Sequence, residues 1–214
     1  MRRYNAVVTA FPSTAKGRAT RERIVEAAAE LVAERGVAGT SLDDVRDRAT
    51  VSKGQLYHYF ADRDDLLRAV AGATCDAVLE VQADALAEFD SLAGVERYLD
   101  ATVALQQERE AHGGCPIGSL AGQLAERDEG ARLVLAGGFE RWEAGLRAGL
   151  DAMADRGELR AGAEPRLLAT QILALLQGGL LLTQVRRDPS QMRAAADGAL
   201  ALLRAAAKTT ERKS

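Results

Sequence analysis

Residues 51–60, VSKGQLYHYF, place side chains that can bind a nucleic acid close together in the chain. Lys53 and Tyr57 carry groups that suit phosphate oxygens, and the amide of Gln55 can pair with the edge of an adenine. The spacing, together with a basic N-terminal arm, favours contact with DNA. The alternative is that Tyr57 and Tyr59 only cover a small, poorly buried core.

Few other residues have types and spacings that suggest chemistry. His112 and Cys115 stand three residues apart, but no second pair completes a zinc site. Cys115 would suit a redox sensor if it were exposed with a lowered pKa, although a buried structural thiol is commoner; Cys75 is typical of core. Neither a nucleophile–base pair nor a phosphate loop is visible. We therefore expect no enzyme, no metal and no cofactor.

The charge is unevenly distributed along the chain. The net charge is -3, yet residues 1–70 hold 12 Lys and Arg against 10 Asp and Glu, so the acidic excess lies beyond them. Within residues 1–23, six basic side chains face only Glu22. A basic arm on an acidic body is typical of a phosphate-contacting head on a larger body with another role. Short basic arms also occur as solubilising tails.

The elements that position residues 51–60 are short helices. Residues 20–36 follow helical spacing, with Thr20 as the expected N-cap, and residues 42–49 form a second helix. A break of about four residues precedes a third helix, in which Leu56 and Phe60 share one face and pack as core. A short helix, a turn and a short helix is the helix-turn-helix spacing, whose second helix enters the DNA major groove.

The stretch TRERIVEAAAELVAERGVAGTSLDDVRDRATVSKGQLYHYFADRDDLLRAV, residues 20–70, resembles the DNA-binding head of TetR-type transcriptional regulators. The family pattern is a Thr-initiated helix ending at a glycine, a Thr-Ser cap and a Val-Ser-Lys-Gly-x-Leu-Tyr-His-Tyr-Phe segment. One departure is Thr50, where the family usually has Gly. If Thr50 adopts a left-handed conformation, it carries a steric cost that Gly avoids.

The resemblance implies which residues meet the DNA. Hydroxyl and backbone N–H groups at two helix starts would hold phosphates, Gly54 would let the backbone approach closely, and Gln55 would read a base. Arg63 stands where the family often has a phosphate-binding Lys. The implied DNA-binding set is Thr40, Ser41, Ser52, Lys53, Gly54, Gln55, Tyr57, His58 and Arg63.

The expected fold class is all-α, with an N-terminal three-helix helix-turn-helix DNA-binding head and a helical ligand-binding and dimerisation body. We expect a basic flexible arm over residues 1–17, the helix-turn-helix domain over 18–64, the effector-binding and dimerisation domain over 65–208, and a tail over 209–214. The body also resembles, more loosely, a subgroup with a Gly-Cys-Pro element, here Gly114-Cys115-Pro116.

The helix expected over residues 165–186 is apolar nearly all round, which is typical of a helix buried on every side. With residues 189–207 it forms half of a four-helix homodimer interface, as the family implies, so a charge at Leu176 should prevent dimerisation. A wholly intramolecular core is the alternative. Three glutamines would lack partners in lipid, so we expect no membrane span. The scarcity of cysteines and the lack of a signal-peptide pattern favour a cytoplasmic protein.

The effector site is the least defined part of the sequence. A mostly apolar pocket with a few polar groups is usual, and Gln106 and Gln107 are further candidates to point inward. The expected effector-binding set is Leu105, Cys115, Ile117, Gln123, Phe139, Trp142 and Gln171. A lone Trp is more often ordinary core. We expect a ligand-responsive DNA-binding regulator, a repressor released from operator DNA by a small apolar or aromatic effector. A helical scaffold without effector control is the alternative.

Overall fold

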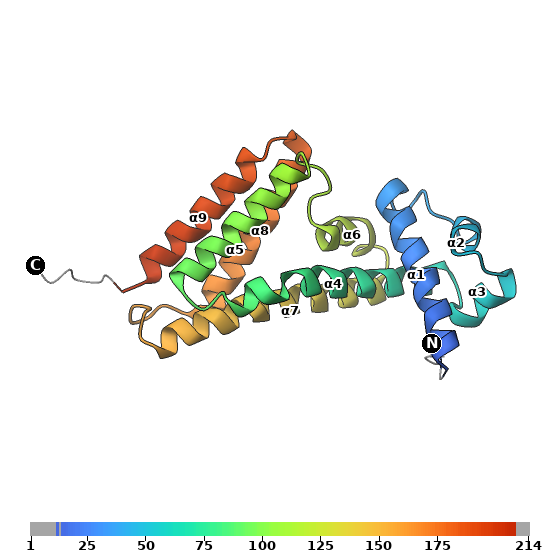
Figure 1. Ribbon diagram of the computed structural model, residues 1–214, viewed down its shortest axis with the longest axis horizontal. Helices are drawn as coiled ribbons and strands as arrows, with labels where there is room; N and C mark the ends of the chain where they lie inside the picture. The colour runs from blue at the N-terminus through green and yellow to red at the C-terminus, as the bar shows by residue number, and fades with distance from the viewer. Residues whose placement is uncertain (1–11, 13, 209–214) are drawn as a thin grey trace, which may run out of the picture. The chain divides into compact units, whose positions relative to one another are not determined.

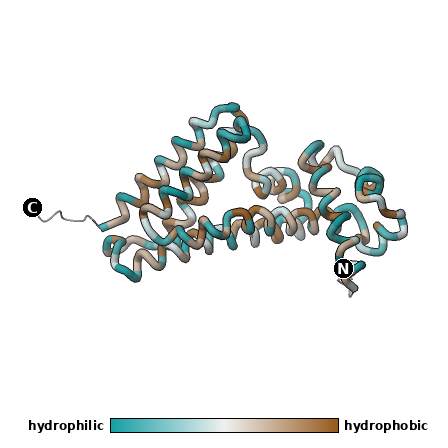
Figure 2. Tube along the Cα trace, viewed as in Figure 1, coloured by the Kyte–Doolittle hydropathy of each residue, from teal (hydrophilic) through white to brown (hydrophobic). Residues whose placement is uncertain are grey.

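The computed structural model describes residues 12 and 14–208, and within them the chain is all-α, as predicted (Figure 1). The helices are α1 (Ala15–Arg35), α2 (Leu42–Ala49), α3 (Lys53–Tyr59), α4 (Arg63–Ala87), α5 (Leu92–Glu108), α6 (Pro116–Leu124), α7 (Glu129–Asp155), α8 (Pro165–Arg186) and α9 (Ser190–Ala206). Hydrophobic and hydrophilic residues both occur along these helices (Figure 2), and the hydrophobic ones provide the surface that the helices bury.

Helix α1 begins earlier than predicted. Thr14 is its N-cap, and the Thr14 hydroxyl oxygen accepts a hydrogen bond from the Gly17 N–H at 3.1 Å. The expectation that Thr20 caps this helix is wrong, because Thr20 lies inside it and its buried hydroxyl donates to the Lys16 carbonyl. Both threonines can cap a helix, and the good helix formers between them let the helix extend back to the earlier one.

The described chain divides into two compact units. The head unit contains the described residues up to Asp76 together with Leu120–Leu135, and the body unit contains Ala77–Ser119 and residues 136–208. The head unit is larger than the predicted domain 18–64 because the first half of α4 and the α6–α7 corner cluster with α1–α3. Residues 15–17 of the predicted arm are helical. The rest of that arm, apart from residues 12 and 14, and the tail 209–214 lie outside the described residues.

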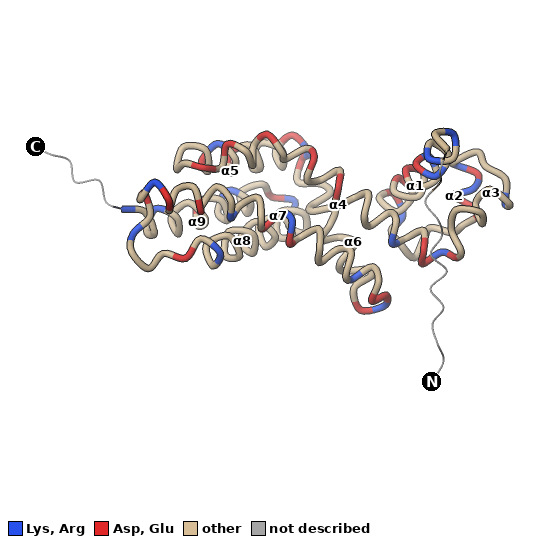
Figure 3. Tube along the Cα trace, turned by 90° about the horizontal axis from the view of Figure 1, so that it is seen from below, with Lys and Arg blue, Asp and Glu red and all other residues tan. Residues whose placement is uncertain are grey.

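Arginines fix the helices of the head unit to one another. Arg23 Nε donates to the Ala49 carbonyl at 3.1 Å, which joins α1 to the end of α2. Arg48 forms ion pairs with Glu30 and Glu34 of α1, at 3.0 and 3.1 Å. Acidic and basic side chains are interspersed over the head unit (Figure 3), and some of its arginines bond to other residues of the same unit.

The α6–α7 corner is bonded into the head unit. Gln123 Oε1 accepts a hydrogen bond from the Val37 N–H at 2.8 Å. Arg68 on α4 forms two contacts with Asp128, Nε to Oδ1 at 3.0 Å and Nη2 to Oδ2 at 2.9 Å. Such a two-bond pairing is the stronger geometry of an Arg–carboxylate contact. The corner is thus an integral part of the head, although it lies more than fifty residues further along the chain.

In the body unit α8 packs against α9, and ion pairs join α9 to α5, including Arg193 with Asp100 at 2.8 Å. The buried residues of α8 are Leu168, Ala169, Ile172, Leu173, Leu176, Gly179, Leu180 and Thr183. Within the single chain α8 leaves Leu167, Leu181, Leu182 and Val185 exposed, so burial on every side would need the predicted partner subunit and stays a prediction. By length and composition α8 is the one described helix that is long and apolar enough to cross a membrane, and 44% of its apolar window is buried inside the protein.

Candidate nucleic-acid interface

A left-handed residue sets the turn between α2 and α3. Thr50 has φ 53° and ψ 52°, and its N–H donates to the Asp47 carbonyl at 3.2 Å. This is the conformation in which the sequence analysis assigned a cost to Thr, because its Cβ crowds the backbone where glycine has none. The turn nevertheless forms, and Val51 closes it with an N–H bond to the Arg46 carbonyl at 3.1 Å.

Helix α3 buries one face and exposes the other. Leu56 and Phe60 are each 2% exposed, which confirms that they belong to the core. Lys53, Gln55, Tyr57 and His58 are exposed, and Tyr59 is half-buried. The Lys53 ammonium lies 6.0 Å from the Tyr57 ring centroid, a cation–π arrangement that holds both side chains on the outer face. The predicted DNA-contacting side chains of α3 are therefore brought together on one accessible surface.

Both helices of the motif begin with a capping box. The Ser41 hydroxyl oxygen accepts from the Asp44 N–H. The Ser41 hydroxyl and the Ser41 N–H both donate to Asp44 Oδ2, and these two bonds hold the pKa of Asp44 below its usual range. In α3, Ser52 and Gln55 exchange the equivalent pair of bonds. The two boxes satisfy backbone N–H groups that helix starts otherwise leave unpaired.

Glycine at position 54 is not required by packing inside the protein. A Cβ built at Gly54 would lie 4.0 Å from the Ser52 hydroxyl oxygen and would meet nothing closer. Alanine is the better helix former by up to about 1 kcal/mol. The protein thus forgoes helix stability at an exposed position on the outer face of α3, which fits a close approach of something outside the chain.

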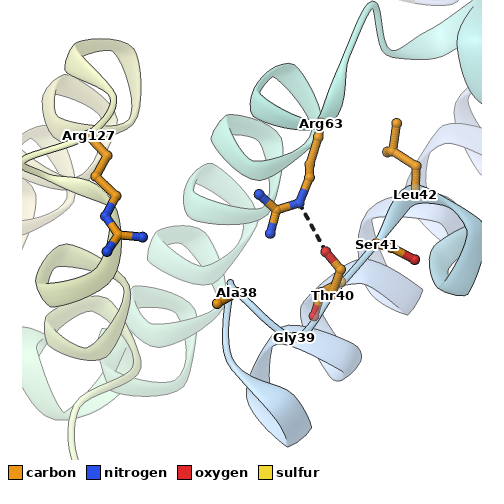
Figure 4. Close-up of a pocket in the computed structure, with 7 residues that line it drawn as sticks. All are labelled: Ala38, Gly39, Thr40, Ser41, Leu42, Arg63 and Arg127. Carbon is orange, nitrogen blue, oxygen red and sulfur yellow. Dashed lines mark hydrogen bonds between the residues drawn. The ribbon is translucent and has the colours of Figure 1, made fainter.

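Two of the predicted DNA-contacting side chains are used inside the head. Thr40 is buried, and its hydroxyl donates to the Gly36 carbonyl at 3.0 Å. Arg63 Nε donates to the Thr40 carbonyl at 3.0 Å (Figure 4). The Nη2 of Arg63 donates to the Val37 carbonyl. Both residues hold the connection between α1 and α2, since its carbonyls have no helical partners. Contact of either side chain with DNA stays a prediction.

An open pocket of about 620 Å³ adjoins this connection, lined by Ala38, Gly39, Thr40, Ser41, Leu42, Arg63 and Arg127. Arg127, on the α6–α7 corner, is exposed and extends toward the recess (Figure 4). Arg127 could not be predicted as part of this site, because no local pattern in the sequence places residue 127 beside residues 38–42. The pocket adds a second guanidinium group to the start of α2.

In the body unit a chain of buried hydrogen bonds surrounds the single tryptophan. Trp142 Nε1 donates to the Tyr98 hydroxyl oxygen at 2.9 Å, and that hydroxyl donates to Gln82 Oε1 at 2.6 Å. Tyr98 and Gln82 were missed by the sequence analysis, since neither stands near Trp142 in the chain. Ile117 is fully buried, and Cys115 is 8% exposed. Burial raises the pKa of the Cys115 thiol, which disfavours the reactive thiolate that a redox sensor needs.

The other predicted effector-binding residues differ in how far they are buried. Leu105 and Phe139 are half-buried. The expectation that Gln171 and Gln107 point inward is wrong, because both are exposed. Gln123 belongs to the head unit and is engaged by the Val37 N–H, as described above. Gln106 does point inward and is 1% exposed.

Comparison with known proteins gives a family match for both the N-terminal and the C-terminal part of the chain. The model for bacterial regulatory proteins of the tetR family matches residues 24–70, and the model for the tetracyclin repressor-like C-terminal domain matches residues 91–199. The chain is 30% identical over 173 residues to an HTH-type transcriptional regulator of the lacX 3' region of Lactococcus lactis subsp. lactis, covering 80% of this chain and 86% of that relative.

A second relative is an HTH-type transcriptional regulator of Mycobacterium tuberculosis, 31% identical over 181 residues, covering 78% of this chain and 86% of the relative. Among solved structures, a TetR-family transcriptional regulator from Cytophaga hutchinsonii is 17% identical and superimposes with a TM-score of 0.80, covering 93% of this chain and 100% of that one. With the exposed face of α3 and both models matched in chain order, this chain belongs to the TetR family of DNA-binding transcriptional regulators.

Proposed function

We propose that the protein is a cytoplasmic homodimeric repressor that leaves its operator when a small effector binds in the body unit, and that it acts by binding rather than by catalysis. The description of the matched C-terminal model as repressor-like supports the direction of control. The proposed DNA contacts come from the outer face of α3, with the helix starts at Ser41 and Ser52 and the basic residues around them holding phosphates.

The exposed apolar face of α8 supports the homodimer. Leu181 is 58% exposed and Val185 is 71% exposed, one turn apart on the same side. A Cβ at Gly178, on that side, would meet nothing within 4 Å, so another helix can approach closely there. Burying such a face in a two-fold interface removes apolar surface from water in both subunits. Leu176, by contrast, is fully buried within one chain and belongs to its core.

The observation that carries the effector proposal is three buried polar atoms in the body unit. Gln106 Oε1, Gln177 Nε2 and Thr183 Oγ1 are buried without a hydrogen-bond partner among the described residues. A buried polar group left unpaired costs about 1–3 kcal/mol, so a bound molecule with a matching polar group would gain that amount. Other side chains of the body unit, including Ile117 and Trp142, are apolar and buried, which supports an effector that is otherwise apolar.

Helix α4 belongs to both units, so it would connect effector binding in the body unit to release of the operator by the head unit. Its first part, from Arg63, belongs to the head unit, and its last part, to Ala87, belongs to the body unit. An effector that binds one arrangement of this helix better than another changes operator affinity, and linkage requires operator DNA to change effector affinity by the same factor.

Native mass spectrometry of the purified protein would identify a retained compound. That compound would then be titrated against Trp142 fluorescence with and without operator duplex. We expect a fluorescence change, because the indole N–H is bonded to Tyr98, and a weaker effector affinity in the presence of operator. Equal affinities in the two titrations would contradict effector control and leave a constitutive DNA binder.

A further inference from the structure

The cap at the start of α3 fixes which atoms of Gln55 are free. The Ser52 hydroxyl oxygen accepts a hydrogen bond from the Gln55 N–H at 3.1 Å. In return, Gln55 Oε1 accepts a hydrogen bond from the Ser52 N–H at 2.8 Å. The Gln55 side chain is therefore folded back onto its own helix start, although the residue is exposed.

The direction of the Gln55 amide follows from the chemistry of its partner. A backbone N–H is satisfied only by an acceptor, so the carbonyl oxygen of Gln55 faces Ser52 and the amino group takes the other position. That amino group has two N–H donors and no lone pair to accept with. As long as the cap is closed, Gln55 offers two donors to an external partner, and its one acceptor atom keeps only the second of its two lone pairs.

On this geometry, and resting on the proposal that α3 reads the major groove, we propose that Gln55 selects guanine. An unconstrained glutamine pairs with adenine by donating to N7 and accepting from the N6 amino group. Guanine presents two adjacent acceptors, N7 and O6, which the free amino group meets without opening the cap. Adenine would have to place its N6 donor on the oxygen that already serves the Ser52 N–H.

Helix α2 shows the same cap built with an acid. Asp44 Oδ2 accepts from the Ser41 N–H at 3.0 Å, as Gln55 Oε1 does from the Ser52 N–H. Glu is also a good third residue for a capping box, so Gln55→Glu keeps the start of α3. The Gln55→Glu substitution replaces the outward N–H donors by a carboxylate oxygen that only accepts. It is therefore a matched variant that keeps the cap and exchanges a donor for an acceptor at the group that reads the base. Gln55→Ala removes both the cap and the reading group.

The test is selection of duplexes from a random pool by the full chain and by Gln55→Ala, Gln55→Glu and Lys53→Ala. The position whose preference is lost in Gln55→Ala is the one that Gln55 reads. There the wild type should enrich guanine over adenine by about tenfold, the scale of one good base contact. Gln55→Glu should shift the preference to cytosine, which presents a donor at N4. Lys53→Ala should bind all sequences more weakly with the same preference.

Atomic substitution in the selected duplex gives a second measurement. Replacing that guanine by 7-deazaguanine removes one acceptor and should weaken binding about fivefold, a fraction of that contact. Inosine, which keeps N7 and O6, should bind like guanine. Adenine at this position, or an unchanged preference in Gln55→Ala, would overturn the assignment while DNA binding stands. If the wild type enriched no sequence at all, the proposed operator-binding function itself would fail.

Discussion

At the scale of single residues, the positions of the helix-turn-helix differ in whether helical spacing, backbone conformation or a side-chain bond fixes their role. The core positions Leu56 and Phe60 follow from helical spacing, and the structure confirms them. The steric cost expected for a left-handed Thr50 applies, because its φ is 53°. The side-chain bond of Gln55 to Ser52 was not predicted, because an exposed glutamine at this position fits both a free base reader and a cap. Only atomic geometry separates the two.

Thr50→Gly should stabilise the protein. A left-handed conformation costs a residue with a Cβ about 1–2 kcal/mol, and glycine returns part of that gain through its larger unfolded-state entropy. We expect the free energy of unfolding, measured in urea, to rise by about 0.5–1 kcal/mol. Thr50→Ala, which keeps a Cβ, serves as the control and should gain less. A loss of stability in Thr50→Gly would show that the threonine side chain contributes more than its backbone strain costs.

At the scale of elements, helix existence was predictable and helix orientation was not. The breaks between helices are marked in the sequence, so the bounds predicted for α2, α8 and α9 agree closely with those observed, whereas α1 begins earlier. In α8, however, apolar residues occupy every side, so no pattern indicates which side a single chain buries. Gln171 was assigned to the wrong side for that reason. The bonds of Gln123 and Asp128 to the head could not be predicted, because they join elements far apart in the chain.

The Arg68–Asp128 pair should make the stability of the head depend on pH. Hydrogen bonds from Arg68 lower the pKa of Asp128. A carboxyl whose pKa is lowered by folding contributes stability above its unfolded pKa of about 3.9, and that contribution is lost as pH falls through the folded value. Asp128→Asn keeps the bond to the Ala131 N–H, since Asn also caps helices, but removes the charge.

We therefore expect Asp128→Asn to lower the free energy of unfolding by about 1 kcal/mol at pH 7, with a deficit that shrinks toward pH 3. Urea unfolding of both proteins at several pH values measures this difference. Glu129→Gln is the matched control, because it removes an exposed partner of Arg132 and should change stability little. A deficit of the same size at every pH would contradict the ionic contribution.

At the scale of the whole molecule, binding to a two-fold operator requires two copies of the chain. A head that reads a two-fold operator presents its recognition helices about one DNA turn, roughly 34–36 Å, apart or at a multiple of it. The exposed face of α8, with Leu181 and Val185, is the proposed contact that fixes this spacing. Neither the sequence nor one folded chain specifies the partner, because an apolar helix fits an intramolecular core as well as an interface.

Leu181→Glu and Leu176→Glu should fail in different ways. Leu181 is 58% exposed in the single chain, so a carboxylate there leaves the fold intact but is buried unpaired in the dimer. Light scattering should then show a monomer with native helical circular dichroism. Leu176 is fully buried, and a charge there should destabilise the fold itself by about 3–5 kcal/mol. A Leu181→Glu protein that stays a dimer would move the interface elsewhere.

The proposed function depends on contact between the outer face of α3 and DNA, and Gly54→Ala tests that contact. Fluorescence anisotropy with a selected operator duplex would compare the wild type, Gly54→Ala and Gly122→Ala, with unfolding measured in parallel. Gly122 is a matched control on α6, exposed and with nothing within 4 Å of an added Cβ. We predict that both variants keep or gain stability, that Gly122→Ala binds normally, and that Gly54→Ala binds operator about tenfold more weakly, a loss of about 1.4 kcal/mol. Wild-type affinity in Gly54→Ala would contradict contact between the outer face of α3 and DNA, because the added methyl group would then meet no DNA.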